Sequence, residues 1–280
     1  MIITCGNTTV PFRVQLDVPQ FPFHASSVYN LRVRLKRTLG PLSVIAMAAA
    51  LAAAPVGPAP KPAKPTKPLV IAAKVAPFNV PVGSTFEYAI LDSAGTRVAT
   101  ASYRVVRDEK AQGMVAIRYV GKGKAFSESS SVAFDPKTMH PARSSRKMVS
   151  GQDQYDVSVV YASDGINVVE AVGGKTQNRS ITPDPQVFDF EELMFLLPQL
   201  DFQGAKKVYV HVFHPNNANV EILILTDEGA DKVDLGGKMV DAERLTFSFA
   251  GGGLKAWVRR ASPARLVKYD TGRFVFLMAK

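Results

Sequence analysis

The chain has 280 residues, a formal net charge of +10 and one cysteine, Cys5. A charge of this size raises the question of nucleic-acid binding, but the excess lies near the N-terminus, because from residue 75 onward 25 basic residues stand against 23 acidic ones. A domain so close to neutrality lacks the concentrated basic face that phosphate binding uses, which argues against a nucleic-acid partner. One cysteine also excludes a disulfide within the chain.

Residues 1–31 contain three prolines and no sustained apolar periodicity. They precede a segment that has the features of an export signal, whereas such signals normally stand at the start of a chain. Two interpretations stay open: an over-extended gene start with true initiation near Val33, or a genuine disordered leader.

Residues 32–54 have the pattern of a secretory signal peptide. Four basic residues within residues 32–37 precede an apolar run whose uninterrupted part, residues 42–54, is thirteen residues long. A membrane span needs about 20 apolar residues, so this run is too short to cross. Its small C-terminal residues suit signal peptidase, and we expect a mature chain that starts between Ala53 and Val56 and is periplasmic or secreted. The alternative, a buried Ala-rich helix, fits poorly with the basic residues before it.

Residues 55–74 form a Pro/Lys-rich linker in this interpretation. Residues 55–68 read PVGPAPKPAKPTKP, a composition that favours extended polyproline II over helix or sheet. The linker is either a tether whose lysines are attracted to anionic lipid or cell-wall surfaces, or a disordered leader to the domain.

Residues 75–280 alternate between apolar and polar side chains, which predicts β-strands. Phe86, Tyr88 and Ile90 share one face of such a run. The same alternation recurs in residues 115–119, 157–161, 208–212, 245–249 and 274–278. Turn-forming residues separate the runs, so we expect a mainly β domain of about ten to twelve antiparallel strands.

One segment, residues 186–202, breaks this alternation. Asp189 and Glu192 have the spacing of a capping box, with Asp189 as N-cap, Glu192 reaching back to it and Glu191 facing solvent. The following Leu193 to Leu197 are apolar on every side of a helix, so the helix must be enclosed. A sheet curled around it would give a half-open barrel that encloses one short apolar helix.

Several short motifs support a resemblance to known families. They are residues 83–88 (GSTFEY), the hairpin of residues 92–100, residues 134–141 (FDPKTMHP), residues 188–190 (FDF) with 201–204 (DFQG), and residues 255–258 (KAWV) with 264–269 (ARLVKY). The order of elements resembles the periplasmic family called domain of unknown function 3108, and more distantly the half-barrels of LolA and LolB type lipoprotein-localisation proteins. The resemblance implies a half-open barrel and, for the carriers, a lipoprotein acyl chain as ligand.

Catalytic and cofactor signatures are absent from the sequence: it has no nucleophile elbow, zinc-protease motif or phosphate-binding loop, so we expect no enzyme, metal or cofactor. His211 and His214 are spaced to face opposite sides of a strand. Arg143 and Arg146 suggest either an anionic headgroup site or, more simply, a solvated strand edge. Trp257 falls on the polar side of its strand and lines a mouth or packs under a loop.

The leading functional hypothesis is therefore a non-enzymatic envelope protein that holds an apolar ligand, such as an acyl chain, in the curved sheet. The residues predicted to bind it are Phe188, Leu193, Leu196, Leu197 and Trp257. The alternative is a structural or interaction module tethered near the cell wall or a membrane complex, with another envelope protein as partner. An outer-membrane β-barrel is a third class, disfavoured by charges inside the strand runs, such as Arg118 and Glu170.

Overall fold

The computed structural model describes residues 70–123, 126–151, 153–182, 184, 186–249 and 252–279. The predicted leader, signal peptide and most of the predicted linker lie outside these residues. The described part is mainly β, with sixteen strands in one sheet and two in a small second sheet. The mainly β class is confirmed, whereas the predicted number of strands is too low.

The elements follow one another along the chain with short connections. In order they are β1 (Ile71–Ala72), β2 (Lys74–Val75), β3 (Thr85–Leu91), β4 (Arg97–Arg107), β5 (Val115–Gly123), β6 (Phe126–Phe134), β7 (Pro141–Ser150), β8 (Asp153–Ala162), β9 (Gly165–Val172), β10 (Lys175–Ile181), β11 (Val187–Asp189), the 3-10 turn η1 (Phe190–Glu192), α1 (Leu193–Leu196), the 3-10 turn η2 (Leu197–Gln199), β12 (Leu200–Asp201), β13 (Lys207–His214), β14 (Asn219–Asp234), β15 (Met239–Phe249), β16 (Gly252–Arg259), β17 (Arg265–Asp270) and β18 (Val275–Ala279).

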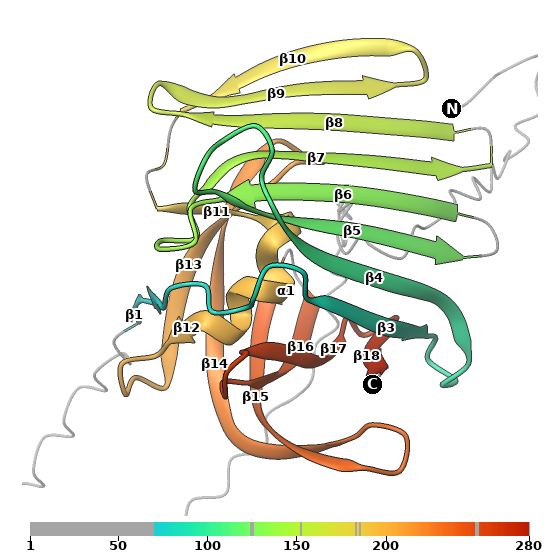
Figure 1. Ribbon diagram of the computed structural model, residues 1–280, viewed down its shortest axis with the longest axis vertical. Coiled ribbons are helices and arrows are strands. Elements are labelled where there is room, and N and C mark those ends of the chain that lie inside the picture. Colours follow the sequence, from blue (N-terminus) through green and yellow to red (C-terminus); the bar gives the residue numbers. More distant parts are fainter. Residues whose placement is uncertain are drawn as a thin grey trace, which may run out of the picture. The chain divides into compact units, whose positions relative to one another are not determined.

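The large sheet has two arms that meet where the last strand, β18, pairs with β3. One arm runs from β3 through consecutive hairpins to β10, and the other runs from β18 back to β13 (Figure 1). Neighbours are antiparallel, except that β1 and β11 lie parallel to β13 along the edge not taken by β14. The strand order has two ends, so hydrogen bonding does not close the sheet.

The predicted linker extends too far along the chain. Ile71 pairs with Val208 in the large sheet, and Val75 pairs with Leu200 in the small one. The ordered domain therefore includes residues before Val75, within the predicted linker of residues 55–74. Strands of two residues show no alternation, which is why the sequence pattern did not reveal them.

The short helix lies between the two arms of the sheet (Figure 1). The capping box is confirmed, because Asp189 accepts a hydrogen bond from the backbone N–H of Glu191 and Glu192 accepts one from the backbone N–H of Asp189. Helix α1 and the flanking 3-10 turns bury Leu193, Leu196 and Leu197 in the main core. The sheet therefore encloses an apolar helical segment, as its sequence required.

Side chains bring the two ends of the sheet together. On β13, Val212 belongs to the main core, while the next residue, Phe213, packs with Val157 and Val159 of β8. Neighbouring residues of a strand point to opposite faces, so both faces of β13 are covered at this end. The ring of Phe213 meets that of Tyr161 edge-on, with centroids 5.9 Å apart.

Candidate functional site

The enclosed helix fills the space between the arms with its own side chains. Leu196 and Leu197 are 0% and 1% exposed. The Phe195 ring contacts the rings of Phe86 and Tyr103 at centroid distances of 5.5 and 5.7 Å. Leu193, Leu196 and Leu197 are absent from the linings of four cavities of about 320, 430, 590 and 610 Å³ among the described residues. The segment made of η1, α1 and η2, residues 190–199, therefore acts as a plug. The three leucines that were predicted to bind a ligand are core residues.

Phe188, the fourth predicted residue, lies at the margin of the main core. It lines a cavity of about 320 Å³ together with residues of β1 and β13. Its ring stacks on the imidazole of His140 at a centroid distance of 5.3 Å. The cavity is small and its wall is partly polar, with Lys137 and His211 contributing.

A buried charge network joins the plug to β6 and β7. The Arg146 Nε lies 2.6 Å from Glu128 Oε1, and its Nη1 lies 3.4 Å from Glu191 Oε1. All three side chains are buried or nearly so, and β7 lies in the interior of the sheet. The sequence prediction of a solvent-facing Glu191 is wrong, and Arg146 is on neither a solvated edge nor an exposed headgroup site. A buried arginine needs carboxylate partners, and the plug supplies one of them.

Burial raises the pKa values of three carboxyl groups, Glu128 on β6 and the capping-box residues Asp189 and Glu192. Burial raises the pKa of Glu128 to about 7, although the Arg146 charge opposes this shift. Burial raises the pKa of Asp189 to about 6, and the pKa of Glu192 well above its usual value. The Tyr161 hydroxyl donates a hydrogen bond of 2.6 Å to Asp189. Of these groups, Glu128 and Asp189 change protonation with pH near neutrality.

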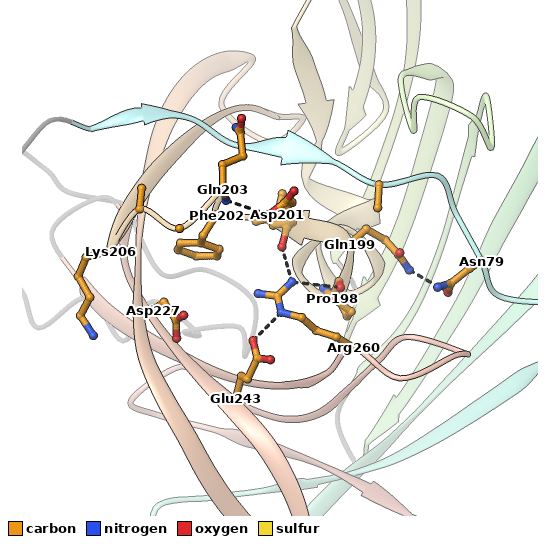
Figure 2. Close-up of a pocket in the computed structure, with 14 residues that line it drawn as sticks. Asn79, Pro198, Gln199, Asp201, Phe202, Gln203, Lys206, Asp227, Glu243 and Arg260 are labelled. Atoms are coloured by element: carbon orange, nitrogen blue, oxygen red, sulfur yellow. Dashed lines mark hydrogen bonds and ion pairs between the residues drawn. The ribbon is translucent and has the colours of Figure 1, made fainter.

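A cavity of about 610 Å³ lies beside the C-terminal end of the plug (Figure 2). Arg260 crosses it: its Nε donates to Glu243 at 2.5 Å, and its Nη1 donates to the backbone carbonyl of Leu200. Asn79 accepts a hydrogen bond from Gln199 in the same wall. The polar groups at the centre of this cavity thus satisfy one another, and the arginine fixes the end of the plug.

The hairpin of β14 and β15 is bent where its register shifts between Asp227 and Gly229. Gly229 has φ +87°, a conformation that L side chains rarely adopt, and its N–H donates to the Asp227 side chain. Beyond this bulge the hairpin covers the outer face of β16 and β17, where Val233 and Ala242 pack on Trp257 and Val267. A bulge of this kind redirects a strand and increases its twist.

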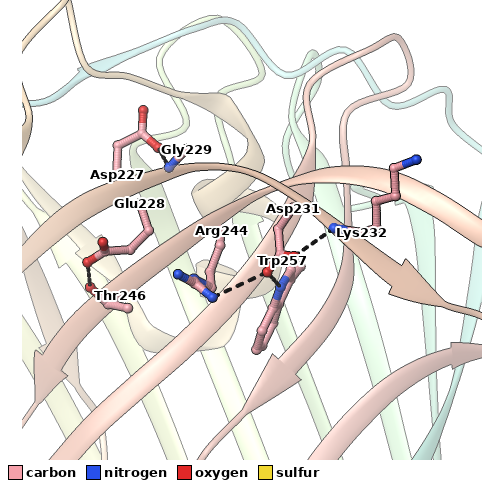
Figure 3. A network of polar contacts seen from close by, with 8 residues as sticks. All are labelled: Asp227, Glu228, Gly229, Asp231, Lys232, Arg244, Thr246 and Trp257. Carbon is pink, nitrogen blue, oxygen red and sulfur yellow. Dashed lines mark hydrogen bonds and ion pairs between the residues drawn. The ribbon is translucent and has the colours of Figure 1, made fainter.

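Trp257, the fifth predicted residue, lies under this hairpin rather than at an exposed mouth. It is 7% exposed, and its Nε1 donates to Asp231 at 2.8 Å (Figure 3). Arg244 also reaches Asp231, and the Lys268 ammonium lies 4.3 Å from the centre of the indole ring. The hydrogen bond from Trp257 lowers the pKa of Asp231. The tryptophan belongs to a separate small core, so the structure does not bring it together with Phe188 and the leucines.

The tip of the same hairpin forms one wall of a cavity of about 590 Å³. Its apolar lining comes from the hairpin and from β17 and β18, and consists of Leu235, Met239, Val240, Val267 and Met278. Three basic residues, Lys238, Arg259 and Arg265, share the lining with one acidic residue, Asp241. An apolar wall with a few charged groups is the usual composition of a small-molecule site.

The two predicted strand histidines do not form a metal site. His211 Nδ1 lies 2.5 Å from Asp184 Oδ2, whereas His214 is buried beside the ring of Phe190. Within the part of the chain that the structure describes, no group of three or more His, Cys, Asp or Glu side chains is arranged to hold a metal ion. No helix in that part is long and apolar enough to cross a membrane.

Comparison with known proteins agrees with the family suggested by the sequence motifs. Residues 82–276 match the model of the family described as protein of unknown function (DUF3108). The chain belongs to the DUF3108 family. None of the curated proteins matches it. Among solved structures it is similar to the beta-barrel-like protein of domain of unknown function DUF1849 from Brucella abortus, with 12% identity, 74% of this chain and 97% of that chain covered, and a TM-score of 0.47. The resemblance to lipoprotein carriers stays an expectation.

In this DUF3108 chain, sequence reasoning missed the hairpin cavity. Its residues come from three separate segments, at the β14–β15 turn, at the β16–β17 connection and on β18. The local sequence offers one signal, the adjacent basic residues Arg259 and Arg260, and the structure gives these two residues different roles. Arg260 is satisfied by Glu243 and the plug, while Arg259 points to the cavity. The three segments come together because the hairpin bends at Gly229, and the sequence alone did not locate this bend.

Proposed function

We propose that the protein is a non-enzymatic binding protein that holds the acyl chain of an amphiphile in the hairpin cavity. The observation that carries this proposal is the cavity of about 590 Å³ with Leu235, Val240 and Met278 in its wall. Its volume falls within the range of about 300–1,000 Å³ that small-molecule sites have. Each Å² of apolar surface that an acyl chain removes from water there would contribute about 25 cal/mol of favourable free energy.

The hairpin cavity suits a ligand better than the space between the arms of the sheet does. The plug fills that space, and a ligand would have to displace side chains such as Leu196, which is completely buried. The hairpin tip, in contrast, is exposed, with Met239 58% exposed. A ligand can reach this site without unfolding the core.

The proposal includes export to the periplasm through the signal-like residues 32–54. There the protein would meet lipids and lipoprotein acyl chains, which supply ligands of the required chemistry. The basic residues before the apolar run, and the small residues at its end, support this location.

Titration with a neutral amphiphile tests the proposed function. Trp257 is the only tryptophan, and it packs on Val267 of the cavity wall, so its fluorescence reports binding. The glycerol ester of dodecanoate should shift this emission. A Met239→Asp variant should bind the ester at least about tenfold more weakly. A bound acyl chain would have to cover the new carboxylate, and taking this charge out of water costs more than the roughly 1.4 kcal/mol that corresponds to a tenfold change in Kd.

The matched control is Ile222→Asp, at a position that is 60% exposed and lies outside the described cavities. It should bind the ester as the unmodified protein does. If the ester does not bind to the unmodified protein, or if both variants bind it equally well, the hairpin cavity is not an acyl-chain site.

The second candidate function is an interaction module for another envelope protein. Ile222 and Ile224 are exposed on one face of β14, 60% and 43% respectively. Tyr209 and His211 are their cross-strand partners on β13. Exposed apolar side chains in a contiguous patch favour a protein contact, but isolated ones are common on soluble proteins. Two isoleucines make a small patch, so we favour the amphiphile.

A further inference from the structure

We propose that the hairpin cavity selects amphiphiles whose head group is a carboxylate or a phosphate monoester, and that Arg259 and Arg265 bind it. The inference rests on the proposed function, because it concerns the same cavity. It names the chemistry of the head group, which the apolar lining leaves open.

The first argument is the position of the two arginines in the sheet. Arg259 of β16 and Arg265 of β17 are direct cross-strand partners, and both line the cavity. Side chains of such partners lie on the same face about 5 Å apart at Cβ, and like charges there destabilise the pair. An anion between the two guanidinium groups would turn this repulsion into attraction.

The second argument is that these cations lack partners among the residues that the structure describes. Among the described residues, no ion pair or side-chain hydrogen bond involves Lys238, Arg259 or Arg265. The Nε of Arg265 is buried without a hydrogen-bond partner. A buried donor without a partner loses its bond to water, so a ligand oxygen at this place would remove a cost.

Three other arginines of the same domain, Arg146, Arg244 and Arg260, have acidic or carbonyl partners, and the cavity arginines differ from them. Arg146 and Arg260 bind carboxylates and, for Arg260, backbone carbonyls. Arg244 reaches Asp231 at 3.4 Å. The one acidic residue of the cavity wall, Asp241, faces Lys232 at 3.8 Å and is 90% exposed. The cavity therefore has an excess of positive charge that the described protein does not neutralise.

The arrangement of the lining fits an amphiphile with one chain and an oxyanion head. The arginines project from the β16–β17 end of the cavity, while Leu235, Val240 and Met278 supply its apolar wall. The planar guanidinium group binds two oxygens of a carboxylate or a phosphate at once. Lys238, on the exposed hairpin turn, adds a third positive charge at the rim.

Three ligands with the same chain and different heads test the inference on the full-length protein. They are dodecanoate, dodecyl phosphate and the neutral glycerol ester of dodecanoate, each titrated below its micelle concentration. The anionic ligands should bind at least about tenfold more tightly than the ester, and sodium chloride should weaken only their binding. Comparing dodecanoate with dodecyl phosphate distinguishes the two sources of the anion.

The variant R259Q/R265Q removes both charges while keeping hydrogen-bond donors. It should lose the preference for the anionic ligands and keep its affinity for the ester. The control R97Q/R107Q makes the same change of charge at two exposed positions of β4, outside the described cavities, and should keep the preference. If the double variant is unstable, K238Q at the exposed turn should reduce the preference by a smaller factor.

The outcomes separate the inference from the proposed function. Equal binding of anionic and neutral ligands would overturn the head-group inference and leave the proposed function standing. An unchanged preference in R259Q/R265Q would overturn it as well. Failure of all three ligands to bind would overturn the proposed function itself. If inorganic phosphate binds as tightly as dodecyl phosphate, the dodecyl chain of the ligand adds nothing to the affinity. That result would also contradict the proposed function.

Discussion

Leu196 illustrates how closely the plug is packed, and its truncation tests this at a single residue. Its side chain is 0% exposed, within the cluster that joins the plug to both arms of the sheet. Leu196→Ala should lower the free energy of unfolding by about 2–5 kcal/mol, because it removes buried methyl groups and leaves a cavity. Chemical denaturation measures the loss. The control, Val160→Thr at a half-exposed position of β8, should change stability by less than about 0.5 kcal/mol. Equal effects of the two substitutions would contradict a packed plug.

At the residue scale, the sequence predicted local contacts and missed distant ones. The capping box of Asp189 and Glu192 was predictable because both partners lie within one turn of helix. The burial of Glu191 was not predictable, because its partner Arg146 is 45 residues away and reaches it only in the folded sheet. The alternation on β16 placed Trp257 on the correct face, but its cover comes from the bent hairpin of β14 and β15.

At the scale of elements, Gly229 controls the bend that lays the hairpin over Trp257. Gly229→Ala should destabilise the protein by about 1–3 kcal/mol, because the positive φ is strained for any residue with a Cβ. Nothing lies within 4 Å of the added Cβ, so backbone strain alone is being tested. The control is Gly253→Ala, a strand glycine whose φ is not in this region and whose Cβ also meets nothing. A thermal melt of both variants should show a loss for Gly229→Ala alone. A neutral Gly229→Ala would mean that the bulge does not depend on glycine.

The strands that the sequence failed to predict share a physical cause. β1 and β2 have two residues each, and β10 has a single apolar residue, Ile181. Their pairing comes from neighbouring strands rather than from an apolar face of their own. Long hairpin strands such as β14 lose the alternation where the bulge inserts a residue. Periodicity therefore finds strands with one buried face and misses edge strands and bulged strands.

At the scale of the whole molecule, the buried carboxyls link stability to pH. Glu128 on β6 and Glu191 on the plug share Arg146 on β7, so the network connects the plug to one arm of the sheet. Burial raises the pKa of Glu128 from 4.5 to about 7 and that of Asp189 from 3.8 to about 6. At pH values between the unfolded and the folded pKa of each group, the folded protein therefore holds a proton that the unfolded chain has released. By linkage, these groups stabilise the fold fully below their unfolded pKa values, and this stabilisation is lost as pH rises through their folded values.

We therefore expect the free energy of unfolding to fall as pH rises from about 5 to about 8, by an amount on the order of 3 kcal/mol from Glu128 alone. Asp108 and Asp184 have lowered pKa values and act in the opposite direction, but their effect is lost only in more acidic solution, below the usual aspartate range. Glu128→Gln should flatten the profile, because glutamine keeps the shape without the titration. Glu109→Gln, at an 81% exposed side chain, should leave the slope unchanged. Urea denaturation across this pH range measures the profile. Two results would contradict the prediction: a free energy of unfolding that rises with pH, or a slope that is unchanged in Glu128→Gln. Either result would mean that Glu128 stays ionised in the folded protein, because the charge of Arg146 lowers its pKa more than burial raises it.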